Sequence, residues 1–330
     1  MLSVIIGDIV GSRFEFMSTQ EKDVQLFHSA CSFTDDTVCH AAITQANLKN
    51  KSLSFQEYQK TYTKELISFC KKYPMAGYGK GFHEWTKNPV PYQSNANGCL
   101  MRVSSVSLIF NEKIDEITDL ATAITHNHPE ALIHTQYYSQ ILFSLKKSCI
   151  ENRDEVYKKN IIKDFLIQNS IDVGSVENYH QTGGYHVFAK PTLQRALASW
   201  LEAQSFEETL RNSLYIGSDT DTTCAIAATL AEYTWGIEKN MLEQLYRYFD
   251  FKNIELLKII CTSYKSSNYH SCISDDTKSY IETIINLQLT DPTAAYDALD
   301  IPSDEDYYKA KKHNNNPLSL LDQIKKYLHF

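Results

Sequence analysis

Two short acidic segments carry the residues in this chain that are best suited to chemistry. Thr34-Asp35-Asp36-Thr37 and Asp219-Thr220-Asp221-Thr222 each place two carboxylates and at least one hydroxyl within a single helical turn. These groups are hard oxygen ligands, and neither segment contains His or Cys, which favours Mg²⁺, Mn²⁺ or Ca²⁺ over zinc. Two such ions, about 3.5–4 Å apart, can orient a diol and activate a water molecule.

Each segment taken alone has a simpler explanation. Both stand immediately before a helical pattern, so a Thr or Asp cap with acids in the first turn accounts for either one. Capping uses only one side-chain oxygen, however, and the surplus oxygens need other partners. If the two helix starts face each other, four carboxylates converge, and they raise each other's pKa unless cations neutralise them. The two segments therefore predict a binuclear cation site, on the condition that they face each other.

Helices are the elements that would position these segments. Alternating, strand-like patterns are scarce, and only Val187-Phe188 and its neighbours favour extended backbone. Apolar residues recur at helical spacing, or Ala and Leu are enriched, over residues 38–48, 114–125, 131–145, 156–167, 194–203 and 224–235. The fold class that we expect is all-α, with many packed helices.

The chain has 330 residues, of which 43% are hydrophobic and 22% charged, a composition typical of globular proteins. The composition changes after about residue 250, where polar and turn-forming residues become frequent. We therefore expect a catalytic domain at residues 1–250 and a C-terminal helical appendage of unknown role at 251–330. The appendage is expected to end in an amphipathic helix, Leu318 to Leu328.

Charge and cysteine usage exclude several classes of protein. The formal net charge is −8 with no long basic run, so a face that binds duplex nucleic acid is not expected. Asp8 interrupts the apolar start of the chain, which predicts neither a cleaved signal nor a membrane span. None of the eight cysteines forms a Cys-x-x-Cys pair. A cytoplasmic protein with reduced thiols is expected, although delivery by a specialised secretion system would leave no readable mark. The sequence indicates no particular oligomeric state.

Further motifs accompany the acidic segments in a fixed order. They are Gly7–Glu15, Phe33–Thr37, Tyr73–Gly79 with Pro91–Ser94, Asn97–Arg102, Thr125–Glu130 and Gly217–Thr222. Together they resemble the ADP-ribosylglycohydrolase family, which includes the dinitrogenase-reductase-activating glycohydrolases and the ADP-ribosyl-acceptor hydrolases. The resemblance covers about residues 1–245 and implies an all-α, orthogonally packed fold with two Mg²⁺ ions, Mn²⁺ being an alternative. It also implies hydrolysis of an N- or O-glycosidic bond at C1″ of ADP-ribose that is attached to a protein, a small molecule or a nucleic acid.

The resemblance assigns roles to the acidic residues. The metals would hold the 2″ and 3″ hydroxyls of the distal ribose, and a water would attack C1″ through an oxocarbenium-like transition state. Asp36 is the favoured base, Asp35 is the close alternative, and Glu15 would reach the metals or gate the site. The implied metal ligands are Thr34, Asp35, Asp36, Asp219, Asp221 and Thr222.

Other residues are expected to bind the substrate. A small polar loop that leads into an apolar run can cradle a pyrophosphate, although it is also an ordinary turn. Arg102 pairs with either the ligand or a buried acid, His126 binds phosphate or ribose or only packs, and Tyr185 stacks on adenine or only packs. Ser218 replaces the second Gly of the usual Gly-Gly-Asp. The expected substrate-binding residues are Ser94, Asn95, Asn97, Gly98, Met101, Arg102, His126, Tyr185, Gly217 and Ser218.

Two further polar residues are not expected to bind metal. His126 and His128 lie at positions i and i+2, which do not share a helix face, so they do not predict a paired metal site. Asp8, flanked by Ile and Gly, is expected to be a buried structural acid that accepts hydrogen bonds from backbone N–H groups.

Two other functions fit the acidic segments. A two-metal phosphohydrolase also uses clustered Asp residues, but such enzymes usually supply His ligands too, and none lies near these motifs. A non-catalytic protein that binds ADP-ribose, or is purely structural, would be favoured by loss of metal ligands, and all six are present. The acceptor that leaves C1″ is not indicated by the sequence.

Overall fold

The computed structural model describes residues 1–17, 19–250 and 252–287. In these residues there are fifteen α-helices and four short 3₁₀ helices but no β-strand, which confirms the predicted all-α fold. Extended pairing is limited, in the described residues, to one isolated bridge between Ala96 and Phe188. The elements are α1 (Leu2–Ser12), α2 (Asp35–Asn50), η1 (Phe55–Glu57), α3 (Tyr58–Lys72), α4 (Lys80–Trp85), η2 (Asn97–Cys99), α5 (Ser104–Ile109), α6 (Ile114–Ala123), α7 (Pro129–Ile150), α8 (Glu155–Gln168), α9 (Val176–Thr182), α10 (Ala189–Glu202), α11 (Phe206–Ile216), α12 (Thr220–Trp235), α13 (Lys239–Leu245), η3 (Tyr246–Tyr248), α14 (Ile254–Lys265), η4 (Asn268–Ser271) and α15 (Asp275–Asn286).

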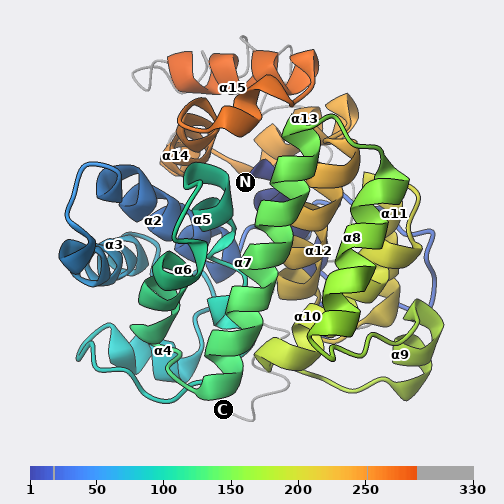
Figure 1. Cartoon of the computed structure of the whole chain (residues 1–330), viewed down its shortest axis with the longest axis horizontal. Coiled ribbons are helices and arrows are strands. Elements are labelled where there is room, and N and C mark those ends of the chain that lie inside the picture. The colour runs from blue at the N-terminus through green and yellow to red at the C-terminus, as the bar shows by residue number, and fades with distance from the viewer. Residues whose placement is uncertain (18, 251, 288–330) are drawn as a thin grey trace.

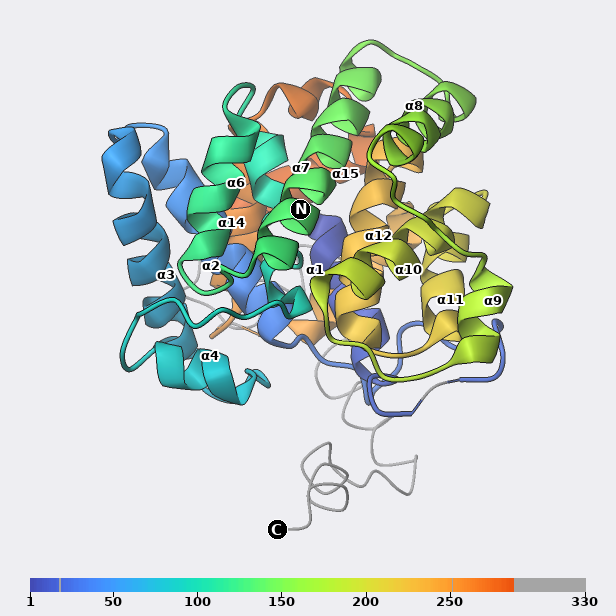
Figure 2. The same ribbon diagram turned by 60° about the horizontal axis from the view of Figure 1, so that its bottom comes forward.

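The centre of the molecule is a helix that the sequence pattern did not predict. All eleven residues of α1 are buried, and their side chains are apolar on nearly every side. A helix of this kind has no polar face and therefore no amphipathic period to detect. Figure 2 shows α1 between α2 and α12, and α1 packs most extensively against α12.

Two glycines allow α1 and α12 to approach closely. A Cβ atom on Gly7 would lie 2.4 Å from the backbone carbon of Cys224, and one on Gly11 would lie 2.3 Å from the backbone oxygen of Thr220. The two helices therefore run antiparallel, with the end of α1 beside the start of α12. Thr220 fixes this register because its hydroxyl donates to the Gly11 carbonyl at 2.8 Å.

The remaining helices surround this pair. α7, the longest helix, crosses the front of the molecule in Figure 1 and packs against α5, α6, α10 and α12. α3 covers α2, and α11 covers α12. One continuous cluster of buried hydrophobic residues extends from Met1 to Ile284, so the two acidic helix starts belong to elements that share a single core.

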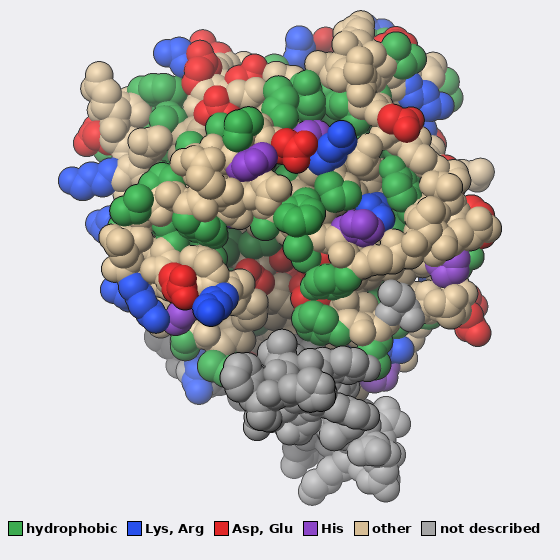
Figure 3. Space-filling model, turned by 90° about the horizontal axis from the view of Figure 1, so that it is seen from below, with side chains coloured by type: hydrophobic (Ala, Val, Ile, Leu, Met, Phe, Trp, Pro, Cys, Tyr) green, Lys and Arg blue, Asp and Glu red, His purple; other side chains and the backbone are tan. Residues whose placement is uncertain are grey.

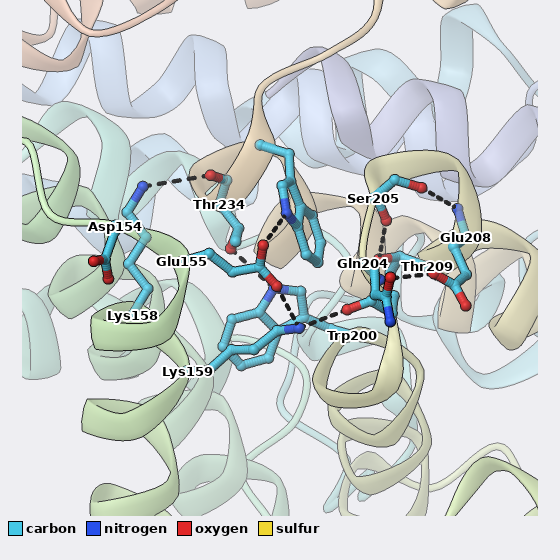
Figure 4. Close-up of polar contacts among 12 residues, drawn as sticks. Asp154, Glu155, Lys158, Lys159, Trp200, Gln204, Ser205, Glu208, Thr209 and Thr234 are labelled. Atoms are coloured by element: carbon cyan, nitrogen blue, oxygen red, sulfur yellow. Dashed lines mark hydrogen bonds and ion pairs between the residues drawn. The ribbon is translucent and has the colours of Figure 1, made fainter.

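The far end of α12 is fixed by polar contacts with α8 and α10, which Figure 4 shows. Lys158 donates to the Tyr233 carbonyl at 3.0 Å, and the Trp235 indole donates to Glu155 at 2.8 Å. The Trp200 indole donates to the hydroxyl of Thr234 at 2.9 Å. These contacts satisfy groups at the C-terminal end of α12, where helix carbonyls lack intrahelical partners.

The described residues after 251 pack on the other helices. α14 contacts α2 and α5, and α15 contacts α13 and α14. The division into a catalytic domain at 1–250 and an appendage at 251–330 stays a prediction. The predicted helix from Leu318 to Leu328 lies outside the described residues. Within the described residues, no helix combines the length and apolar character needed to cross a membrane.

We expect Gly7→Ala to lower the free energy of unfolding by about 3 kcal/mol or more, because the added methyl group would overlap the α12 backbone, which cannot move away as a flexible side chain would. Urea denaturation followed by circular dichroism measures the change. Gly79→Ala is the matched control, since a Cβ there meets no atom within 4 Å. Equal losses in the two variants would contradict the close helix crossing.

Candidate active site and metal centre

The two acidic segments face each other at the starts of α2 and α12. The Thr222 hydroxyl donates to Asp36 Oδ2 at 3.1 Å, and Thr34 Oγ1 lies 3.4 Å from Asp221 Oδ2. The two acidic segments therefore face each other, as the predicted cation site requires, because hydroxyl groups at each helix start contact carboxylates of the other.

Asp8 of α1 holds the first turn of α2 in place. One of its oxygens accepts the backbone N–H groups of Thr34 and Thr37 at 2.9 and 3.0 Å, together with the Thr37 hydroxyl at 2.5 Å. The other oxygen accepts the Thr34 hydroxyl at 2.7 Å. The prediction that Asp8 is a buried acid bonded to backbone N–H groups is confirmed, and these bonds satisfy donors that a helix start leaves free.

Asp219 is oriented by residues from two distant segments. The Asn97 amide donates to Asp219 Oδ2 at 2.8 Å, and the backbone N–H of Asn97 donates to the Val187 carbonyl at 2.7 Å. Gly217 and Ser218 enter α12 with φ values of 75° and 78°, in the left-handed region. Ser218 lacks the freedom of glycine, but its hydroxyl accepts the His186 N–H at 2.6 Å and donates to the His186 carbonyl at 3.2 Å.

Glu15 completes the acidic cluster. Oxygen atoms of Glu15, Asp219 and Asp221 lie within 4.8 Å of one another, a spacing that one metal ion can bridge. The Tyr185 hydroxyl donates to Glu15 Oε1 at 3.2 Å, and the Tyr185 ring stacks on Phe16 with centroids 6.1 Å apart. Residues that follow α1 and residues of the loop before α10 thus meet beside the acidic cluster.

The carboxylates of this cluster are strongly destabilised as anions. Burial, followed by the charge of Asp221, raises the pKa of Glu15 to about 9. Burial also raises the pKa of Asp219 to about 6 and that of Asp36 well above its ordinary value, with Asp221 as the next cause for Asp36. Oδ1 of Asp36 is buried and has no hydrogen-bond partner. Hard oxygen donors, one of them unpaired, fit a divalent cation of the Mg²⁺ type.

A cavity of about 350 Å³ opens over the cluster. Figure 3 views this face from below, where acidic side chains are visible in a hollow among hydrophobic ones. Most of the residues that the sequence singled out line the cavity: Glu15, Asp35, Asp36, Ser94, Asn97, Gly98, Met101, Arg102, His126, Tyr185, Asp219, Asp221 and Thr222.

Four of the predicted site residues are not brought to the cavity wall. Thr34 caps α2, and its hydroxyl contacts Asp8 and Asp221 instead of lining the cavity. The Asn95 carbonyl accepts the Ala189 N–H at 2.9 Å, which ties its loop to α10. Gly217 and Ser218 form the turn that leads into Asp219. Gly217 and Ser218 are therefore connected with the site through the backbone that orients Asp219.

Arg102 and His126 form one hydrogen-bonded chain on the opposite wall. Arg102 donates to the Ala121 carbonyl at 3.1 Å and to the Thr125 hydroxyl at 2.6 Å, and it forms no ion pair with a carboxylate of the described residues. Thr125 lies 2.6 Å from His126 Nδ1. Since burial and then the charge of Arg102 hold the pKa of His126 well below its ordinary value, the ring is neutral. The tautomer in which Thr125 donates to Nδ1 carries the ring proton on Nε2.

Cys39, Phe82 and Tyr92 are among the side chains of the cavity wall that were not expected from the sequence. Tyr92 lies within a motif that was recognised, but no role followed from it. Cys39 follows Asp35 by one helical turn, so its helical position was the available signal. Phe82 of α4 had no signal, because a single aromatic residue in a short helix does not indicate a ligand.

The fold and the site define a helical protein with a buried, oxygen-rich acidic cluster, which could hold metal, beneath a ligand-sized cavity. The chain matches the ADP-ribosylglycohydrolase family over residues 1–259 and belongs to that family. Members act on ADP-ribosylated substrates and are generally metal-dependent. The predicted resemblance is thereby confirmed.

A solved structure supports the same fold. The chain is similar to a protein described as an ADP-ribosylglycohydrolase-related protein complex, with a TM-score of 0.58 and 18% sequence identity. The similarity covers 81% of this chain and 95% of that one. No curated protein sequence matches the chain. At this identity the structural likeness concerns the fold alone.

We expect Asp8→Asn to lower the free energy of unfolding by about 2 kcal/mol, because an amide group in place of one oxygen would point a donor at the N–H and hydroxyl donors of Thr34 or Thr37. Urea denaturation is the measurement. Asp23→Asn, at a fully exposed carboxylate, should change the same quantity by less than about 0.5 kcal/mol. A loss in Asp8→Asn no larger than this would show that Asp8 does not hold α2.

Proposed function

We propose that this protein is a Mg²⁺-dependent hydrolase that cleaves the glycosidic bond at C1″ of ADP-ribose and releases ADP-ribose from its acceptor. The observation that carries the proposal is the unpaired oxygen of Asp36 at the cavity wall, between two acidic helix starts that face each other. Family membership supports the substrate class.

The proposed ligands of two Mg²⁺ ions, or of Mn²⁺ in their place, are Thr34, Asp35, Asp36, Asp219, Asp221 and Thr222. When bound, the ions would neutralise the carboxylates, hold the 2″ and 3″ hydroxyls of the distal ribose and favour ionisation of a water. Their charge would also remove the repulsion that raises the pKa of the buried acids. Glu15 lies close enough to Asp219 and Asp221 to join the same centre.

Asp36 is the proposed general base. The Thr222 hydroxyl fixes one of its oxygens at 3.1 Å, while the other has no partner and can accept a proton from the water that attacks C1″. Asp35 also lines the cavity and is the alternative base. Holding the ribose so that C1″ faces this oxygen is the larger contribution, because it converts a bimolecular step into a positioned one.

The opposite wall is suited to the remainder of ADP-ribose. In the tautomer with its proton on Nε2, the neutral His126 ring can donate to a phosphate or ribose oxygen in the cavity without carrying a charge. Asn97 and Gly98 lie in the small loop beside it, and Ser94, Met101 and Arg102 complete that wall. Asn95, Gly217 and Ser218 would act on the ligand through backbone that they position. Tyr185 would stack on the adenine or contact the acceptor at the mouth of the cavity.

The acceptor is proposed to be a protein side chain, a small molecule or a nucleic-acid base that carries ADP-ribose. We also propose a cytoplasmic location, which is supported by eight cysteines that are all free thiols.

We expect Mg²⁺ to stabilise the protein by about 2.7 kcal/mol when its free concentration is one hundred times its Kd. Because the metal-free carboxylates hold protons at raised pKa values, binding should release protons and become tighter as the pH rises. Thermal melting with and without Mg²⁺, and calorimetry in two buffers of different ionisation enthalpy, measure both effects. Asp221→Asn should reduce both, whereas Asp154→Asn, at the exposed cap of α8, should not. Binding without proton release would place the ions elsewhere.

We expect Asp36→Asn to lower kcat about 10²- to 10⁴-fold, because an amide cannot accept the proton of the attacking water. The assay incubates protein and Mg²⁺ with ADP-ribosyl-arginine, ADP-ribosyl-serine and ADP-ribosylated DNA, and measures free ADP-ribose. Asp154→Asn is the control and should keep full activity. No release from any substrate by the unaltered protein, with ADP-ribose still bound, would identify a binding protein instead. Phosphate release alone would identify a phosphohydrolase.

A further inference from the structure

Exposed hydrophobic side chains are concentrated at the mouth of the active-site cavity. Eight large hydrophobic side chains of the described residues are at least 49% exposed, and six of them line the cavity or lie within two residues of one that does. The other two, Val156 and Ile167, belong to α8, which contributes no residue to the cavity. We call the six the apolar rim: Phe16, Met17, Met75, Val90, Tyr185 and Phe188.

Four separate segments supply the apolar rim, and each also supplies a residue of the cavity wall. They are residues 15–17, 75–77, 90–92 and 185–188. The Phe16 ring stacks on Tyr185, and a Cβ atom on Gly77 would lie 3.8 Å from Asp35 Oδ1. Figure 3 shows hydrophobic side chains around the hollow that contains the acidic ones. The apolar rim therefore lies at the entrance to the acidic cluster.

Hydrogen bonds to the body of the protein hold two of these segments in place. The backbone N–H of Gln93, beside the segment of Val90, donates to the Asn127 side chain at 2.7 Å. In the segment of Tyr185, the His186 N–H donates to the Ser218 hydroxyl at 2.6 Å. A surface that is ordered before binding loses less conformational entropy when a partner docks on it.

The position of the apolar rim determines what it can contact. In the proposed reaction ADP-ribose occupies the cavity, and the acceptor is the group that leaves. The cavity has a volume of about 350 Å³, at the small end of ligand sites, so it cannot enclose a macromolecule. The body of a macromolecular acceptor must therefore rest on the apolar rim while its modified group reaches into the cavity.

The charges at the cavity distinguish between the possible acceptors. Five carboxylates line the cavity, whereas Arg102 is the one Lys or Arg side chain among the lining residues and is only 1% exposed. A nucleic-acid backbone would bring phosphates to this surface without exposed lining cations to neutralise them. A free amino acid is too small to contact four segments at once. An apolar protein surface, in contrast, gains free energy by covering exposed hydrophobic side chains.

We propose that the apolar rim is a docking surface for a protein acceptor whose residues beside the modified side chain are apolar. Each rim side chain that the acceptor covers contributes hydrophobic binding free energy. This binding is the same before and during the chemical step, so it lowers KM for the acceptor and leaves kcat unchanged. The identity of the substrate rests on the proposed function, but docking can also be measured as binding without turnover.

The experiment gives the full-length protein and Mg²⁺ substrates that differ only around the modified residue, which is made as ADP-ribosyl-arginine and as ADP-ribosyl-serine. The substrates are the modified free amino acid, a peptide with Leu, Ile and Phe beside the modified residue, and the same peptide with Ser and Gly in their place. We expect KM for the apolar peptide to be at least about tenfold below that for the polar peptide, at similar kcat.

The double variant Met75→Ser, Val90→Ser tests the apolar rim directly, because neither side chain lines the cavity. It should raise KM for the apolar peptide about tenfold and leave the polar peptide and the free amino acid unaffected. Ile167→Ser is the matched control, since Ile167 is 77% exposed and Met75 is 79% exposed, but Ile167 lies on α8. The control should leave KM unchanged for every substrate.

Several results would overturn the proposal. They are equal KM values for the two peptides, an equal loss in Ile167→Ser, and a loss in the double variant that extends to the free amino acid. More efficient hydrolysis of ADP-ribosylated DNA than of the apolar peptide would identify a nucleic-acid acceptor instead. A dimer of the parent chain in sedimentation that dissociates in the double variant would identify a second copy of this chain as the occupant.

If no substrate is hydrolysed, the proposed function fails, and binding alone decides on the docking surface. Fluorescence anisotropy then measures the Kd of the two ADP-ribosylated peptides for the same proteins with Mg²⁺. Tighter binding of the apolar peptide that is lost in the double variant, but kept in Ile167→Ser, would establish the docking surface without the activity. Equal binding of the two peptides would overturn it.

Discussion

The antiparallel contact of α1 with α12 is the constraint on which the site depends. Gly7 and Gly11 bring the two backbones so close that no larger residue fits between them. The same contact sets the start of α12 beside the end of α1, where Glu15 follows, and Asp8 of α1 binds the first turn of α2 from the other side. One buried helix thus fixes three segments that carry carboxylates, although it contributes no group to the proposed chemistry.

The buried acidic cluster is energetically unfavourable for the folded protein when its carboxylates are ionised. Burial and mutual repulsion raise the pKa values of its carboxylates, so the protein without metal would keep several protons in the centre near neutral pH. The hydrogen bonds from Thr222, Asn97 and the backbone orient these groups but leave one Asp36 oxygen unpaired. Because these carboxylates are already held in place, little has to move when cations bind, and the cluster is preorganised for them.

Sequence reasoning reached several helices that show a pattern and the acidic segments that start two of them, but it missed α3, α11, α14 and α15, whose apolar residues also recur at helical spacing. α2, α6, α7 and α12 have amphipathic or alanine-rich sequences, and residue type alone indicated hard-oxygen ligands. It could not find α1, which is apolar on nearly every side, or show that two segments about 185 residues apart face each other. Of the two expected partners of Arg102, the buried acid is absent among the described residues, and its bonds go instead to a carbonyl and a hydroxyl, which no local pattern indicates. These contacts arise from tertiary packing.

Ser218 has a consequence of another kind. Its left-handed backbone is unfavourable by about 1–2 kcal/mol for a residue other than glycine, and its hydroxyl offsets this by accepting the His186 N–H and donating to the His186 carbonyl. Those bonds join the turn that aims Asp219 to the loop that carries Tyr185. A glycine at position 218 would therefore relieve the backbone strain but would lose the hydroxyl that ties the turn before Asp219 to the loop of Tyr185.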